Sequence, residues 1–146
     1  MPAQVGAGMT DALPDTELRT LLARTRTVAV VGLSASLHRT SHGVASYMYA
    51  HGFRIIPINP NVPEVFGQKA YGTLAEAARH AHIDLVNVFR RSEDVPPVID
   101  EAVAIGAPAV WLQLGIRHDG AAAKARAAGL VVVQDRCIMV EHRRLN

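Results

Sequence analysis

The chain has 146 residues, of which 49% are hydrophobic and 19% are charged, a balance that excludes intrinsic disorder and supports one self-sufficient core. Its 15 Lys and Arg against 13 Asp and Glu leave a formal charge of +2, so we expect no nucleic-acid partner. A single cysteine excludes an internal disulfide, and no apolar stretch reaches the roughly 20 residues of a membrane span. We expect a cytoplasmic protein with no membrane partner, built as one domain over residues 14–146 behind a flexible arm at residues 1–13.

The hydrophobic pattern alternates between strand-like and helix-like segments. Short apolar runs such as residues 28–31, which end at Gly32, are typical of strands buried on both faces of a parallel sheet. Helical spacing follows them, and one helix opens with a Thr73-x-x-Glu76 capping box. In chain order the patterns predict a helix at 14–26, a strand at 28–31, a helix at 41–52, a strand at 53–58, a loop at 59–63, a very short strand near 69–71, a helix at 73–80, a strand at 83–89, a helix at 95–105, a strand at 109–112, a helix at 119–129, a strand at 130–133 and a helix from about 136.

The helix starts carry local signals. Ser41 and Asp119 have side chains that can cap the helices they precede, and Pro96 and Pro97 are tolerated in the first turn of theirs. Strands that alternate with helices at this spacing imply right-handed crossovers. The predicted fold is therefore α/β: a Rossmann-like, three-layer domain with a mostly parallel sheet of about five strands.

Ligands of an open α/β sheet bind outside the carboxyl ends of its strands, which directs attention to four loops. They begin at Gly32, Asn59, Phe89 and Gln113. The first loop, residues 32–41, supplies hydroxyls, backbone amides and Arg39, and the helix behind it adds a partial positive charge. These groups favour a phosphate, although a simple turn at Gly32 with a helix cap at Ser41 explains the same residues.

The remaining loops bear on which phosphate ligand is bound. Ser34 stands where the dinucleotide fingerprint needs its second glycine, and Asn59 stands where an acidic residue would hold the ribose of NAD. An NAD(P)-linked oxidoreductase stays an alternative. Phe89 with Arg90 and Arg91 can pack against a base and neutralise a phosphate, or form a packed ring with solvated cations. Gln113, at the carboxyl end of its strand, can also face a ligand.

A hydrolytic site is an alternative interpretation of the first loop. Residues 32–36 half resemble a Gly-x-Ser-x-Gly nucleophile elbow, with Asp119 or Asp135 and His118 or His142 as conceivable partners. Nothing in the sequence places a base beside the serine. We predict no catalytic residues.

The sequence signals for a metal site and for thiol chemistry are weaker than those for phosphate binding. Only two histidine pairs are close in sequence, and no carboxylate or cysteine completes either at a familiar spacing. They are His38 with His42 and His80 with His82. We predict no metal site. Cys137 follows Arg136, which could favour its thiolate, whereas a buried, inert cysteine is the commoner case.

Taken together, the motifs resemble those of the small bacterial and archaeal CoA-binding proteins, relatives of the N-terminal CoA-binding domain of the succinyl-CoA synthetase alpha subunit. The resemblance runs from about Val28 to Glu141. It is carried by Val31-Gly32-Leu33-Ser34 with Arg39-Thr40-Ser41, Pro57-Ile58-Asn59-Pro60, Gly67 with Tyr71-Gly72-Thr73-Leu74, Val88-Phe89-Arg90-Arg91, Val110-Trp111-Leu112-Gln113-Leu114-Gly115, and Asp135-Arg136-Cys137 with Glu141.

The resemblance implies a role for each loop. The loop at residues 32–41 would hold the phosphates of coenzyme A, the loop after residue 57 would border the nucleotide, and Phe89 with Arg90 would flank the adenine and its ribose phosphate. Cys137 would lie near the pantetheine end. The predicted binding set is Gly32, Leu33, Ser34, Ser36, Arg39, Thr40, Ser41, Pro57, Asn59, Pro60, Phe89, Arg90, Arg91, Gln113 and Cys137.

The chain departs from the synthetase in two ways that affect the expected function. The synthetase has a lysine shortly after the second-strand proline, whereas Asn61-Val62 stand here, so Lys69, Arg90 or Arg91 would supply the charge. The chain also ends before any ligase domain. We expect a binding module for coenzyme A or a short acyl-CoA rather than an enzyme, with a homodimer or an acyl-CoA enzyme as a conceivable partner. A detached subunit of an acyl-CoA ligase stays an alternative.

Overall fold

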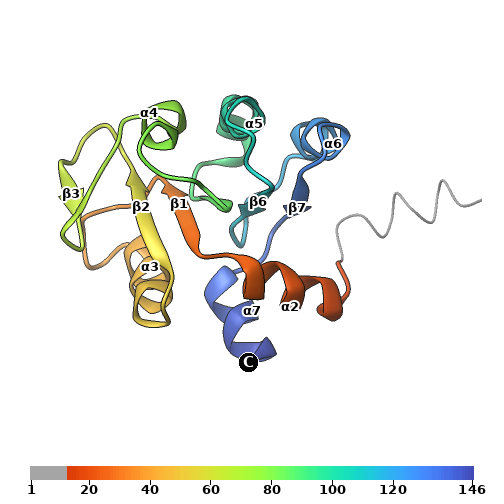
Figure 1. Ribbon diagram of the computed structural model, residues 1–146, viewed down its shortest axis with the longest axis horizontal. Coiled ribbons are helices and arrows are strands. Elements are labelled where there is room, and N and C mark those ends of the chain that lie inside the picture. Colours follow the sequence, from red (N-terminus) through yellow and green to blue (C-terminus); the bar gives the residue numbers. More distant parts are fainter. Residues whose placement is uncertain (1–12) are drawn as a thin grey trace, which may run out of the picture.

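The computed structural model describes residues 13–146, so the arm predicted at residues 1–13 lies, except for its last residue, outside the described part (Figure 1). The helices are α2 (Asp15–Arg24), α3 (Thr40–Ala50), α4 (Leu74–Ala78), the short 3-10 helix η1 (Ser92–Asp94), α5 (Val95–Ala104), α6 (Asp119–Ala127) and α7 (Ile138–Leu145). The strands are β1 (Thr27–Val31), β2 (Arg54–Ile58), β3 (Glu64–Val65), β4 (Gln68–Lys69), β5 (Leu85–Val88), β6 (Ala109–Leu112) and β7 (Val131–Val133).

Five strands form one parallel sheet in the order β2-β1-β5-β6-β7, which confirms the predicted Rossmann-like α/β fold. Pro57 lies in β2, at the edge of this sheet, opposite Val30 of β1. Its carbonyl accepts the N–H of Tyr71 on the side away from β1. The N–H that proline lacks would point to the same side as this carbonyl, where β2 has no full strand partner. A sheet tolerates proline at such an edge.

Two helical layers cover the sheet (Figure 1): α4, α5 and α6 on one face, and α2, α3 and α7 on the other. Alternation along β5 divides its side chains between the two cores, with Val86 and Val88 in the first and Leu85 in the second. Trp111 of β6 is fully buried in the second core, and its indole N–H donates to the carbonyl of Arg136 at 2.8 Å.

The helix caps agree with the sequence at Thr73 and differ at Ser41 and Asp119. The Thr73 hydroxyl accepts the N–H of Glu76 at 3.1 Å, as predicted. Helix α3 begins one residue before Ser41, whose buried hydroxyl instead accepts a loop N–H from Ser34. The α6 cap is His118, because its Nδ1 accepts the N–H of Ala121 at 3.0 Å and leaves Asp119 as the first helical residue.

The very short strand predicted near residues 69–71 is replaced by a hairpin of β3 and β4. Phe66 and Gly67 form its turn with φ values of 56° and 70°, the two positive values that a tight hairpin turn uses. Tyr71 makes only an isolated bridge to Ile58. The Phe66 ring lies 4.7 Å from the ring of His42 on α3, which packs the hairpin turn against that helix.

Candidate functional site

The candidate site lies where the chain changes direction across the sheet. From β1 the chain crosses to β2 on one side and then returns to β5 on the other. The connections that leave β1 and β5 therefore diverge, which opens a crevice at the carboxyl ends of these strands. The strand ends are close neighbours, since the N–H of Phe89 donates to the carbonyl of Val31 at 2.8 Å.

A pocket of about 370 Å³ lies at this crevice. It is lined by Gly32, Ser34, Arg39, Thr40, Ser41 and Phe89. All six belong to the predicted binding set, and five of them come from the loop between β1 and α3 and the start of α3. The volume falls within the usual range for small-molecule sites, about 300 to 1,000 Å³.

The backbone conformation at position 32 requires a glycine. Its φ of +86° is one that residues with a Cβ rarely adopt. A Cβ built there would also lie 2.4 Å from the carbonyl oxygen of Phe89. The absence of a side chain thus allows the first loop to turn tightly against the end of β5.

The serines of the first loop hold its shape. The N–H of Ser34 donates to the Ser41 hydroxyl at 3.0 Å, and the N–H of Ser36 donates to the Ser34 hydroxyl at 3.0 Å. No side chain caps α3 at Arg39, and the first turn of the helix contains no acidic residue. The N-terminal amides and dipole of this 11-residue helix are therefore directed toward the pocket without a competing carboxylate.

The second loop is attached to the first by Asn59. The Asn59 amide donates to the carbonyl of Leu33 at 2.9 Å, and its oxygen accepts the N–H of Asn61 at 2.8 Å. Leu33 has a fully buried side chain, so it can meet a ligand only through its backbone. Pro57 is buried in its strand, whereas Pro60 is exposed beside Gly72.

The two arginines after β5 have different surroundings. The Arg91 guanidinium pairs with Asp94 at 3.0 Å and with Glu93 at 3.7 Å, and the hydrogen bond to Asp94 raises the pKa of Arg91. Arg90 is half-buried and forms no ion pair within residues 13–146. Of the pair, Arg90 is the cation that is not already bound to a carboxylate.

Gln113 is buried, not turned toward the pocket. Its oxygen accepts hydrogen bonds from the amide of Asn87 and from the N–H of Ile138, both at 3.3 Å. This arrangement connects β5, β6 and the start of α7. Sequence reasoning missed Asn87, although an amide inside the apolar run of β5 is the signal that could have found it. Cys137 is half-buried and stands directly before α7.

The residues considered for a hydrolytic site are not brought together. His118 uses its Nδ1 as the α6 cap, and Asp135 accepts the N–H of Gly115 at 2.7 Å. His142 lines pockets with residues that precede β1 and β2, at the opposite end of the sheet. Across residues 13–146 no three His, Cys, Asp or Glu side chains gather as a metal would require. No described helix combines the length and apolar character needed to span a membrane.

The fold and the switch-point pocket define an α/β domain of the ligand-binding Rossmann-like class. A sequence model of the family described as the CoA binding domain matches residues 26–143. The chain belongs to this family.

Similar proteins cover nearly the whole domain. The uncharacterized protein YneT of Bacillus subtilis is 42% identical over 126 residues, which make up 86% of this chain and 92% of YneT. A hypothetical protein from Pyrococcus horikoshii is 34% identical with a TM-score of 0.88, over 92% of this chain and 94% of that chain. A dinucleotide-forming acetyl-coenzyme A synthetase from Ca. Korarchaeum cryptofilum has a TM-score of 0.64 at 20% identity, over 73% of this chain and 25% of that chain, and thus shares the fold.

Proposed function

We propose that this protein binds coenzyme A or a short acyl-CoA and carries out no reaction of its own. One observation carries the proposal: the pocket at the switch point combines a glycine turn, hydroxyls, the Arg39 guanidinium and the N-terminus of α3. These are the donors that a pyrophosphate needs. Membership in the CoA-binding family supports coenzyme A as the source of that pyrophosphate.

Each part of the ligand is assigned to a part of the crevice. The pyrophosphate lies at the start of α3, with Ser34, Arg39 and Thr40 as side-chain donors. The adenine packs beside Phe89, and Arg90 neutralises the ribose phosphate because Arg91 is held by two carboxylates. The pantetheine arm extends along the carboxyl edge toward Cys137, which stands at the start of α7.

The geometry of Asn59 supports coenzyme A over NAD. At the corresponding place a dinucleotide-binding domain uses a carboxylate to hold both ribose hydroxyls. Here both polar atoms of the Asn59 amide are engaged in hydrogen bonds within the loops, to Leu33 and Asn61. The side chain fixes the two loops relative to each other instead of recognising a ribose.

Removal of the Arg39 guanidinium tests the phosphate assignment. Arg39→Ala should weaken coenzyme A binding by about 1.5 to 3 kcal/mol, roughly 10- to 150-fold, because a charge-assisted hydrogen bond is lost. Isothermal titration measures this loss. Pantetheine, which lacks the pyrophosphate, should lose much less.

Arg54→Ala is the matched control, because Arg54 is an exposed arginine at the start of β2, at the other end of the strands. It should bind coenzyme A as the unaltered protein does. Equal losses for coenzyme A and pantetheine in Arg39→Ala, or no loss for either, would remove Arg39 from the phosphate site.

A further inference from the structure

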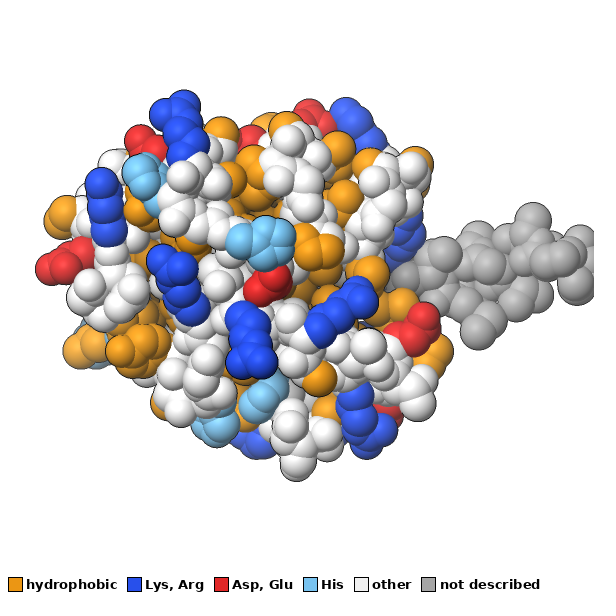
Figure 2. Space-filling view, viewed as in Figure 1, with side chains coloured by type: hydrophobic (Ala, Val, Ile, Leu, Met, Phe, Trp, Pro, Cys, Tyr) orange, Lys and Arg blue, Asp and Glu red, His pale blue; other side chains and the backbone are white. Residues whose placement is uncertain are grey.

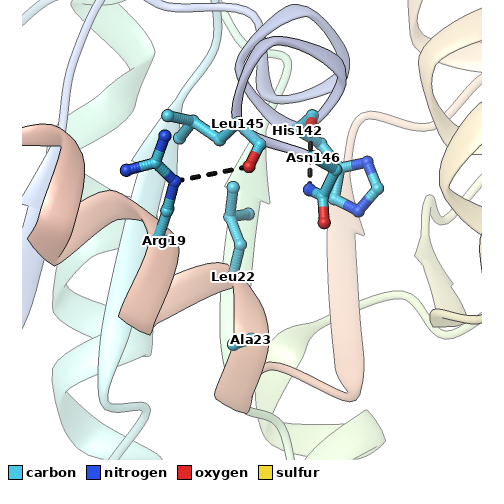
Figure 3. A pocket seen from close by; sticks show the side chains of 6 residues that line it. All are labelled: Arg19, Leu22, Ala23, His142, Leu145 and Asn146. Atoms are coloured by element: carbon cyan, nitrogen blue, oxygen red, sulfur yellow. Dashed lines mark hydrogen bonds between the residues drawn. The ribbon is translucent and has the colours of Figure 1, made fainter.

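A second group of cavities lies at the amino end of the sheet, away from the switch-point pocket. One cavity of about 240 Å³ is formed between α2 and α7, where Arg19 and Leu22 lie opposite Leu145 and the Nε–H of Arg19 donates to the Leu145 carbonyl at 3.4 Å (Figure 3). The next, of about 230 Å³, is lined by Leu22, Ala23, Thr25, Arg26, His51, Gly52, Phe53 and His142. The two share Leu22, Ala23 and His142, so they are adjoining parts of one groove.

Cationic side chains line the groove, and Asp and Glu side chains are absent from its described lining. Arg19, Arg26, His51 and His142 all border it, and no Asp or Glu is among the described residues that line either cavity. Figure 2 shows pale-blue histidines and blue cationic side chains over the region of α3 and α7, with a red acidic side chain close by. The nearby carboxylate of Asp84 accepts the N–H groups of Arg26 and Thr27.

The two histidines are held by Tyr47 on α3. The Nδ1–H of His51 donates to the carbonyl of Tyr47 at 2.8 Å, which leaves Nε2 of His51 as the atom that takes up a proton. The Nδ1 of His142 shares a hydrogen bond of 2.8 Å with the Tyr47 hydroxyl. The His51 and His142 rings are 5.6 Å apart, so protonation of both places two positive charges side by side.

Among the charged groups around His142, His51 opposes its protonation directly. The other charged groups of the groove are Arg26 before β1, Arg19 on α2, whose Nε–H donates to the Leu145 carbonyl at 3.4 Å, and the C-terminal carboxyl of Asn146. Arg143 of the same helix as His142 lies over the Tyr47 ring. Burial and the charge of His51 lower the pKa of His142. A bound anion would relieve this repulsion, whereas a metal cation would add to it.

We propose that this groove is a second ligand site, which binds a small oxyanion of the phosphate type between Arg26, His51 and His142. The guanidinium supplies two parallel donors, and each protonated imidazole supplies one more. A cavity of about 230 Å³ accommodates a phosphate group with part of the molecule that carries it. Because binding and protonation favour each other, the site takes its ligand more tightly as the pH falls.

Sulfate is the first probe, because its charge stays constant over the pH range used. Titration of the full chain, followed by NMR signals of the His51 and His142 rings, should give saturable shifts and several-fold tighter binding at pH 6 than at pH 8. Sodium chloride at equal ionic strength should not reproduce them. Inorganic phosphate and glycerol phosphate then distinguish a free ion from a phosphate monoester.

Two variants separate this site from the proposed coenzyme A pocket. Arg26→Gln and His51→Gln should each weaken sulfate binding at the histidines at least several-fold, whereas Arg39→Ala should leave it unchanged. Absence of saturable shifts at both histidines, or affinities unchanged in Arg26→Gln and His51→Gln, would overturn the proposal. Neither result depends on whether the protein binds coenzyme A.

Discussion

Gly32 meets two requirements that no other residue type satisfies together. Its φ is positive, and a Cβ at this position would lie 2.4 Å from the Phe89 carbonyl oxygen. Both constraints belong to the same turn, which also forms one wall of the pocket. A methyl group at this position forces either the turn or the end of β5 to move. The substitution is therefore expected to lower the stability of the fold and to distort the pocket.

We predict that Gly32→Ala lowers the free energy of unfolding by about 1 to 3 kcal/mol, because it combines a strained φ with a backbone clash. Urea unfolding followed by circular dichroism measures the change. Gly43→Ala is the control, since Gly43 lies within α3 with nothing within 4 Å of an added Cβ. It should raise stability by about 0.5 to 1 kcal/mol, as alanine does in a helix. Similar effects of the two substitutions would contradict this account of Gly32.

At the scale of elements, α7 is held to the sheet by buried polar contacts. Gln113 accepts hydrogen bonds from β5 and from the first N–H of α7, and the Trp111 indole donates to the carbonyl of Arg136 just before that helix. The half-buried Glu141 carboxylate also pairs with Arg136 at 3.2 Å and with Arg144 at 2.7 Å. Removal of the Gln113 acceptor is the sharper test of this attachment, because it leaves a buried N–H without a partner.

Gln113→Met keeps the side-chain size but removes the acceptor, leaving the N–H of Ile138 buried without its partner. We predict a loss of about 1 to 3 kcal/mol in unfolding free energy, the usual cost of an unsatisfied buried donor. Chemical denaturation gives the value. Leu114→Ala, next to it but 67% exposed, should change stability by less than about 0.5 kcal/mol. A neutral Gln113→Met would show that the hydrogen bonds to Gln113 do not hold α7.

The attachment of α7 to α3 should also depend on pH. Burial, then the charge of His51, lowers the pKa of His142 in the folded protein, so the unfolded chain takes up the proton first as the pH falls. In chloride buffers, unfolding free energy should therefore decrease as the pH falls below about 6.5. His142→Gln should make this decrease smaller. A pH dependence identical to that of the unaltered protein would exclude His142 as its source.

At the scale of the whole molecule, the sequence was informative where a pattern is local. Continuous apolar runs predicted the strands of the parallel sheet, and the topology of alternating strands and helices then directed attention to the loop at residues 32–41. Whether Ser41 caps a helix or accepts a loop hydrogen bond is decided by where Ser34 lies in space. Ser34 and Ser41 are seven residues apart in sequence, and the hydrophobic pattern does not specify the shape of the turn between them.

Tertiary contacts explain the other differences between the predictions from the sequence and the structure. The inward orientation of Gln113 depends on Asn87 and Ile138, which belong to separate elements, and the hairpin turn at Phe66 depends on its packing against α3. The groove around His142 unites residues from three segments that are distant in sequence, 19–26, 51–53 and 142–146. No spacing rule brings such residues together, so only the fold reveals them.

Isothermal titration of the ligand-stripped protein with coenzyme A, with NAD and NADP as the comparison ligands, shows directly which of these ligands the switch-point pocket binds. We predict saturable coenzyme A binding in the micromolar range and no heat of binding from either dinucleotide. Binding of NAD or NADP without binding of coenzyme A would contradict the proposed function, as would the absence of binding by all three ligands.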